Sequence, residues 1–80
     1  MSKMELYQQA FIDGLGLEDD VVFDELALGA TQAWDSIGHM TLIAELEDAF
    51  DVQIDADDMT AFDSYASGLV LLERLGVSFA

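Results

Sequence analysis

Residues 36–50 place apolar side chains at the spacing of an α-helix, and this pattern limits the fold more than any other feature of the sequence. At about 100° per residue, one side of this segment gathers the side chains that we expect to face a core. They are Leu42, Ile43, Leu46, Ala49 and Phe50, with His39 at the upper end of the stripe. Asp35 and Ser36 stand at the start, where either side chain could accept a hydrogen bond from the free amides of the first turn. A helix over about residues 36–50 is therefore predicted.

A first helix is expected over residues 3–13, where apolar side chains also recur at helical spacing. The residues of this stripe are Met4, Leu6, Tyr7, Ala10 and Phe11. Gly14 and Gly16 follow the stripe and predict the end of the helix. Residues 15–35 then form a connection that is long for a compact domain, with a short turn expected at residues 24–28. Its apolar side chains are expected to cover the core, and they are Leu17, Val21, Val22, Phe23, Leu26, Leu28 and Trp34.

Two more helices are expected after residue 50. Val52 and Ile54 should turn inward, and a short helix near residues 56–62 carries Met59 and Phe62. Ser64 is expected to cap a last helix over about residues 65–75, which ends at Gly76. Its predicted core residues are Ala66, Leu69, Val70, Leu72 and Leu75. The prediction is therefore one all-α domain over residues 1–80, a four-helix bundle with a short third helix and a long loop between the first two helices.

The chain is 52% hydrophobic and contains no cysteine, so it must fold on an apolar core rather than on disulfides. This hydrophobic content argues against disorder, because disordered chains combine high charge with low hydrophobicity. The absence of cysteine also excludes a thiolate metal site and a catalytic thiol belonging to the chain itself.

Acidic residues dominate the charge, because 17 Asp and Glu face two basic residues, Lys3 and Arg74, for a formal net charge of −15. Phosphate backbones are repelled by such a surface and anionic membranes gain nothing from it, so we expect no nucleic-acid partner. Basic protein surfaces are its natural complement. The same charge opposes compaction, so we expect added salt or magnesium to stabilise the fold.

No segment suggests export or membrane insertion. The first residues contain one lysine, Lys3, with no apolar run behind it, so a signal peptide is not expected. The longest uninterrupted aliphatic stretch is residues 69–72, far short of a membrane span. We therefore expect a cytoplasmic protein without membrane insertion, and a monomer.

Neither an enzyme nor a specific metal site is expected. Ser36 precedes His39, the only histidine, by three residues, but a Ser–His nucleophile also needs oxyanion donors, a cleft and a group that orients the imidazole. Asp35 is badly placed to orient His39, so we expect this histidine to pack or hydrogen-bond at the top of the core. EF-hand loops that begin at Asp51 or Asp55 fail, because alanine or threonine stands where glycine is required.

The side of residues 36–50 away from the core carries a second, smaller apolar stripe. It consists of Ile37, Met40 and Ala44, and it is bordered by Thr41, Glu47 and Asp48. Such a stripe, rimmed with acid, fits a surface for a partner protein. Single apolar residues on a surface also need no explanation, so both interpretations stay open on these residues alone.

Ser36 also allows two interpretations. A hydroxyl at the exposed start of a helix is well placed for a phosphate-linked group, because free amides and the helix dipole favour an anion. It could equally be a plain N-cap. The chain contains its own comparison in Asp63-Ser64, where bulky Tyr65 follows and no acid-rimmed apolar stripe is present, so Ser64 is interpreted as a cap only.

A wider pattern surrounds this serine. It consists of Asp35-Ser36-Ile37, then Leu42, Ile43, Leu46, Glu47 and Phe50, then Val52 and Ile54 leading into Asp57-Asp58. Together with the expected helices, the length and the acidity, this pattern resembles the acyl carrier protein family, most strongly over about residues 23–59. The fold expected from the resemblance is the same four-helix bundle.

The resemblance implies that Ser36 carries 4'-phosphopantetheine, transferred from coenzyme A by a separate phosphopantetheinyl transferase, and that Asp35 lies beside the magnesium site of that enzyme. The thiol of the group would hold an acyl or related group as a thioester, which fits a chain that has no cysteine. The chain itself would catalyse nothing and would present its cargo to acyl-loading and acyl-using enzymes with basic docking patches. The positions that match the family's partner face are Ile37, Met40, Ala44, Glu47 and Asp48.

Four residues depart from carriers of primary fatty-acid synthesis. Those carriers commonly have leucine where this chain has Ile37 and acidic residues where it has Gly38 and Thr41, and they lack the aromatic Trp34. Trp34 with His39 is more similar to stand-alone carriers of specialised pathways, so fatty-acid, polyketide and other pathways stay open, as does an acyl, hydroxyacyl or aminoacyl cargo. His39 could border a pocket for the cargo or the arm. The alternative function is an acidic interaction or regulatory module in which Ser36 is only a helix N-cap.

Overall fold

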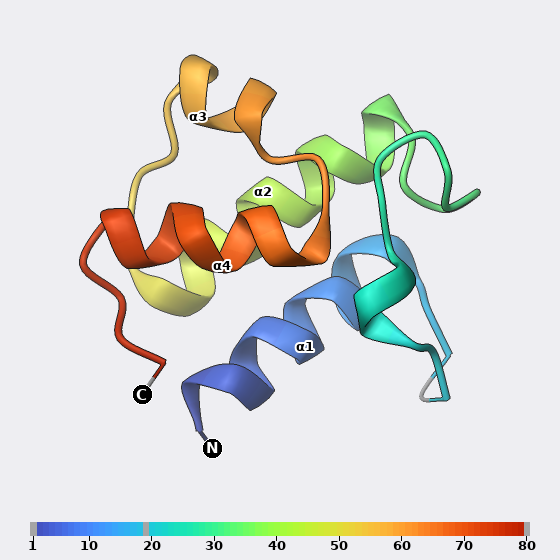
Figure 1. Ribbon diagram of the computed structural model, residues 1–80, viewed down its shortest axis with the longest axis horizontal. Coiled ribbons are helices and arrows are strands. Elements are labelled where there is room, and N and C mark those ends of the chain that lie inside the picture. Colours follow the sequence, from blue (N-terminus) through green and yellow to red (C-terminus); the bar gives the residue numbers. More distant parts are fainter. Residues whose placement is uncertain (1, 19, 80) are drawn as a thin grey trace.

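The computed structural model describes residues 2–18 and 20–79 of the chain. Within these ranges the elements are α1 (Lys3–Leu15), the 3-10 helix η1 (Phe23–Glu25), α2 (Ser36–Phe50), α3 (Ala56–Ala61) and α4 (Tyr65–Arg74). Helix α1 packs along α2, η1 contacts α4, and the short α3 lies at one end of the bundle (Figure 1). The predicted all-α bundle, with its short third helix and long first connection, is confirmed. Every described helix is too short or too polar to cross a membrane.

Helix α1 is two residues longer than predicted. Ser2 is its N-cap, and the Ser2 hydroxyl accepts from the amide of Glu5 in a capping box. Gly16 is its C-cap and adopts a left-handed conformation with φ 66°. Gly14 was expected to end the helix but lies inside it. A Cβ on Gly14 would come within 3.0 Å of the Cα of Leu42, so this glycine allows α1 to approach the backbone of α2.

Aromatic side chains from several segments build the centre of the core. Tyr7, Phe11, Trp34 and Phe62 are fully buried. The ring centroid of Phe11 lies 5.3 Å from that of Trp34 and 6.1 Å from that of Phe62. The hydroxyl of Tyr7 donates a hydrogen bond to the backbone carbonyl of Tyr65, which joins α1 to the start of α4. Rings from α1, the long connection and the residues around α3 and α4 therefore meet in one cluster.

The long connection covers the core as predicted at most positions. Leu26 and Trp34 are buried, and Leu17, Val21 and Phe23 are half-buried. The prediction was wrong for two residues: Val22 is 57% exposed and Leu28 is 38% exposed. The backbone explains Leu28: its amide donates to the carbonyl of Asp63 at 2.9 Å, and this pairing with the chain before α4 holds residue 28 at the surface. Nothing in the structure explains Val22. Helix η1 overlaps the start of the turn expected at residues 24–28.

Helix α2 has the predicted bounds, and its buried residues are Leu42, Ile43 and Leu46. Phe50 is half-buried, whereas Ala49, which was expected in the core, is exposed. Ile54 is buried and Val52 is half-buried after the helix, as predicted.

Helix α4 is rotated relative to the prediction. Tyr65, Gly68, Leu71 and Leu72 are buried, whereas Ala66 and Val70 are exposed. The ring of Tyr65 packs against Tyr7 at 4.9 Å and against Phe11 at 5.4 Å between centroids. Because this aromatic contact sets the rotation of the helix, positions on the same face as Tyr65 turn inward. Ser64 caps α4 by accepting from the amide of Ser67 at 3.1 Å, as predicted.

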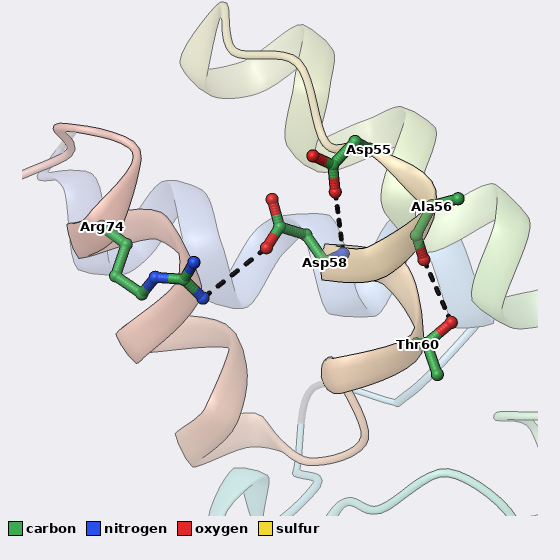
Figure 2. Close-up of polar contacts among 5 residues, drawn as sticks. All are labelled: Asp55, Ala56, Asp58, Thr60 and Arg74. Carbon is green, nitrogen blue, oxygen red and sulfur yellow. Dashed lines mark hydrogen bonds and ion pairs between the residues drawn. The ribbon is translucent and has the colours of Figure 1, made fainter.

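Helix α3 is short and none of its own residues is fully buried. Its cap Asp55 accepts from the amide of Asp58 at 2.9 Å, and the hydroxyl of Thr60 donates to the carbonyl of Ala56 at 3.0 Å (Figure 2). The guanidinium of Arg74 on α4 lies 3.6 Å from the carboxylate of Asp58. Figure 2 shows this ion pair between α4 and α3. The predicted helix near residues 56–62 is therefore present, and half-buried Met59 in its middle packs against the core.

Candidate functional site

The first turn of α2 presents Ser36 with its hydroxyl unused. The carboxylate of Asp35 accepts from the amide of Gly38 at 2.8 Å and is the N-cap of α2, while Ser36 is the first helical residue. Both side chains are exposed, and within the described residues the Ser36 hydroxyl makes no hydrogen bond. The interpretation in which Ser36 caps the helix is therefore wrong, because its neighbour already fills that role.

Gly38 explains how the long connection reaches the start of α2. A Cβ at this position would overlap the carbonyl oxygen of Ala33 and would lie 3.0 Å from a methyl group of Leu15. The connection is folded tightly just before it, with the amide of Trp34 donating to the carbonyl of Thr31 at 2.9 Å. Glycine at position 38 therefore allows the backbone at Ala33 to lie close against the first turn of α2.

His39 lies one turn below Ser36 and uses both ring nitrogens inside the molecule. The indole Nε1 of Trp34 lies 2.9 Å from Nδ1 of His39, and Nε2 of His39 lies 2.9 Å from the carbonyl oxygen of Met59. An indole nitrogen can only donate, so Nδ1 must accept and the proton of the neutral ring must sit on Nε2, which donates to Met59. The expectation that His39 hydrogen-bonds at the top of the core is confirmed.

This arrangement does not activate Ser36. No hydrogen bond joins His39 to Ser36 in the described part of the chain, and the lone pair of Nδ1 is already taken by Trp34. A general base must have a free lone pair within hydrogen-bond reach of the proton it removes. The geometry between these two residues therefore lacks the contact that a Ser–His nucleophile requires.

A shallow hollow lies beside His39 on the side of α3. It has a volume of about 400 Å³ and is lined by Leu28, His39, Ala56, Met59 and Thr60. His39 therefore borders a hollow, and its use for a cargo or an arm stays a prediction. The hydroxyl of Thr60 is occupied by the carbonyl of Ala56, and both nitrogens of His39 are occupied as well, so the wall is largely apolar in character.

The outer face of α2 is exposed along the stripe that the sequence singled out. Ile37 is 79% exposed and Met40 is 58% exposed, and Ala44 and Asp48 are exposed below them. Glu47 differs, because it is half-buried and its carboxylate accepts from the amide of Ile54 at 2.9 Å. The face therefore combines two large apolar side chains next to Ser36 with acid further along the helix, and Glu47 also holds the chain that leaves α2.

Few acidic side chains of the molecule are paired with a basic side chain. In residues 2–18 and 20–79 there is one ion pair, between Arg74 and Asp58. Over the same residues, no three His, Asp or Glu side chains gather closely enough to hold a metal ion. The negative charge is therefore spread over the surface and remains available to a basic partner.

Ser64 provides the contrast that the sequence suggested. It also follows an aspartate at a helix start, but its hydroxyl accepts from the amide of Ser67, and the Ser67 hydroxyl contacts the amide of Ser64 at 2.9 Å. The two serines thus satisfy each other in a capping box, whereas Ser36 stays unpaired among the described residues.

The sequence did not reveal two parts of this site. The close approach at Gly38 and the contact from His39 to the carbonyl of Met59 both depend on tertiary placement. The hydrogen bond between Trp34 and His39 is more local, because the two residues lie five positions apart on either side of the start of α2.

Comparisons of the chain with protein-family models, with curated proteins and with solved structures found no match.

Proposed function

We propose that this chain is a carrier protein of the acyl carrier type, with 4'-phosphopantetheine attached through Ser36. The observation that carries the proposal is the exposed Ser36 hydroxyl, which makes no hydrogen bond among the described residues because Asp35 caps the helix. A serine needed only for helix stability would be expected to make the contact that Asp35 makes.

The surroundings of Ser36 suit a phosphate ester. The backbone amides of Ser36 and Ile37 have no hydrogen-bond partner within the described residues, and they lie at the positive end of a 15-residue helix. Amides at such a position favour an anion, so these two groups would hold the phosphate of the arm. When bound, the group supplies the thiol that carries an acyl cargo as a thioester, which the chain cannot supply because it has no cysteine.

The outer face of α2 is the surface on which partners would dock. Ile37 and Met40 offer apolar contacts beside Ser36, and Ala44, Glu47 and Asp48 extend the face along the helix. A net charge of −15 favours partners with basic patches around an apolar centre. The partners of this proposal are a phosphopantetheinyl transferase and acyl-loading and acyl-using enzymes of fatty-acid, polyketide or other specialised biosynthesis. The chain works as a cytoplasmic monomer that tethers the intermediate and raises its local concentration.

A second candidate uses the same face without any modification. In this alternative the chain is an acidic interaction or regulatory module, and the exposed Ile37 and Met40 are the observation in its favour. The two functions differ only in whether Ser36 is modified.

Intact mass measurement separates them. The apoprotein is incubated with coenzyme A, magnesium and a broad-specificity phosphopantetheinyl transferase, and the carrier predicts a gain of one phosphopantetheine. Ser36→Ala should lose the gain, while the matched variant Ser64→Ala should keep it, because Ser64 is a capping residue in the same Asp-Ser context. An unmodified wild-type chain, under conditions that load a control carrier, would select the interaction module.

A further inference from the structure

We propose that His39 is a positioning residue that fixes helix α3 relative to the turn carrying Ser36. The part of this inference that concerns recognition of Ser36 rests on the proposed function. The part that concerns the placement of α3 does not, because it follows from hydrogen bonds within the chain.

The imidazole of His39 joins three segments that are separate in the sequence. His39 belongs to α2. Its Nδ1 accepts a hydrogen bond from Trp34 at the end of the long connection, and its Nε2 donates to the carbonyl of Met59 on α3. Both heavy-atom distances are 2.9 Å, in the range of well-formed hydrogen bonds. One neutral ring therefore bridges the connection, α2 and α3.

Trp34 makes this bridge directional. Its side chain is fully buried and its ring packs at 5.3 Å from both Phe11 and Phe62, so the indole N–H is held in place by the core. Because that N–H occupies Nδ1, the single proton of the ring is directed to Nε2 and thus toward Met59. The core in this way determines the tautomer, and the tautomer determines the contact with α3.

Few other contacts set the position of α3. The helix has six residues, none of them fully buried, although half-buried Met59 packs against the core. Its ion pair with α4 joins Asp58, whose side chain is 14% exposed, to Arg74, whose side chain is 66% exposed. Because the guanidinium is open to solvent and the distance is 3.6 Å, this pair contributes little to holding α3. Phe62 anchors the chain after the helix, but the His39–Met59 bond is the polar contact between α3 and α2 in the described structure. Losing it should allow α3 to move relative to α2.

This matters for Ser36 because His39 follows it by one helical turn. An enzyme that recognises Ser36 meets the first turn of α2, and the hollow lined by His39 and Met59 lies between that turn and α3. A displaced α3 changes the hollow beside His39, one helical turn from Ser36, while leaving the serine hydroxyl intact. The effect should therefore fall on recognition of the chain, not on the chemical step at the hydroxyl.

Two substitutions separate the two hydrogen bonds. The amide oxygen of His39→Asn can replace Nδ1 as acceptor for Trp34 but does not reach Met59. The longer side chain of His39→Gln can donate to Met59 from the position of Nε2 but leaves Trp34 without its acceptor. Val77→Ala is the matched control, because it removes buried apolar volume at the opposite end of α2, beside Phe50 and Val52, and touches neither bond.

The first measurement needs no variant. Long-range ¹⁵N–¹H NMR correlations of the wild-type ring should show the proton on Nε2 and an acceptor at Nδ1. The opposite tautomer would overturn the bridge. Hydrogen exchange then tests the placement of α3: amides of residues 59–62 should exchange about fivefold faster in His39→Asn than in Val77→Ala at matched stability, the factor corresponding to one lost neutral hydrogen bond. Equal rates would overturn the proposal, whether or not Ser36 can be modified.

The second measurement is transferase kinetics on the wild type and the variants. We expect KM for the apoprotein to rise about fivefold in His39→Asn, with kcat within about twofold, and Val77→Ala to leave both near wild type. His39→Gln, which keeps a donor toward Met59, should raise KM less than His39→Asn does, and a larger rise in His39→Gln would overturn the role of the Met59 contact. If KM rises equally in Val77→Ala, a general loss of stability causes the rise, and the positioning role of His39 is overturned. A wild type that is never modified would refute the proposed function instead, and hydrogen exchange would still decide the role of His39.

Discussion

Asp35 accepts a hydrogen bond from the amide of Gly38 at 2.8 Å, so the residue before Ser36 caps helix α2. Replacing an N-cap aspartate by alanine removes the acceptor of a helix-terminal amide. We therefore expect Asp35→Ala to lower the free energy of unfolding by about 1 kcal/mol. Ser36→Ala should change it by less than about 0.5 kcal/mol, because the exposed hydroxyl makes no contact in the described structure. Urea unfolding followed by circular dichroism measures both, and equal losses would contradict the assignment of the cap.

Ile37 is 79% exposed beside Ser36, and we expect it to contribute to partner binding but not to stability. Ile37→Ala should leave the free energy of unfolding within about 0.5 kcal/mol of wild type. It should raise KM for the phosphopantetheinyl transferase by about fivefold or more, the effect of losing an apolar contact at an interface centre.

Val70 provides the matched control for this prediction, since it is an apolar residue of α4 that is 58% exposed on a different helix. Val70→Ala should leave the transferase KM unchanged. A similar increase in both variants would show that exposed apolar area in general, and not the face of α2, governs the interaction.

Tyr7 should make the fold sensitive to alkaline pH. Burial, and secondarily the nearby Tyr65, raises the pKa of Tyr7 above its ordinary value of 10.0. Because the folded-state pKa is raised, the stabilisation is fully present below the unfolded-state pKa of 10.0 and is lost as the pH rises beyond it. Ionisation would also place a phenolate against the carbonyl of Tyr65, to which the hydroxyl now donates.

The comparison of wild type with Tyr7→Phe measures this effect. The variant should be less stable by about 1 kcal/mol at pH 7, where it lacks the hydrogen bond. The difference should shrink as the pH rises above about 10, because the variant has no phenol to ionise at this position. Urea unfolding at a series of pH values gives the free energy of unfolding of each protein as a function of pH. If this free energy falls equally steeply with pH in wild type and variant above pH 10, the prediction is contradicted.

Salt should stabilise the folded chain. Its formal net charge is −15, and the pair between Arg74 and Asp58 is the one ion pair among the described residues, so mutual repulsion of carboxylates is largely uncompensated. Mobile cations screen such repulsion, and divalent cations screen it at lower concentration. The thermal midpoint should rise with sodium chloride and should rise at lower concentration with magnesium chloride. A midpoint that stays constant from low salt to added magnesium would contradict this account.

The elements that the sequence predicted well are those specified by local chemistry. Helix α2 begins at Ser36 and ends at Phe50 as expected, because a capping aspartate and a clear apolar stripe both lie within the segment. The cap of α4 at Ser64 was predicted for the same reason. At the candidate site, the exposure of Ile37 and Met40 on the side of α2 away from the core was predicted from helical spacing.

The elements that the sequence missed depend on distant partners. Val70 was expected in the core and is exposed, because the docking of Tyr65 on Tyr7 and Phe11 selects which of several apolar faces of α4 turns inward. Gly14 looks like a helix end in the sequence, but it is a point of close approach to Leu42. The bond from His39 to Met59 joins residues 20 apart, and no local pattern encodes a contact to a backbone carbonyl at that separation.

The burial of Trp34 has a practical consequence. It is the only tryptophan of the chain, it stands two positions before Ser36, and its ring lies among Phe11, Phe62 and His39. The molecule therefore contains a single tryptophan, which can be excited selectively above the absorption of its tyrosines, in a buried environment near its candidate attachment residue. Its emission spectrum will report on changes at this end of the protein in unlabelled material, in real time and at low concentration.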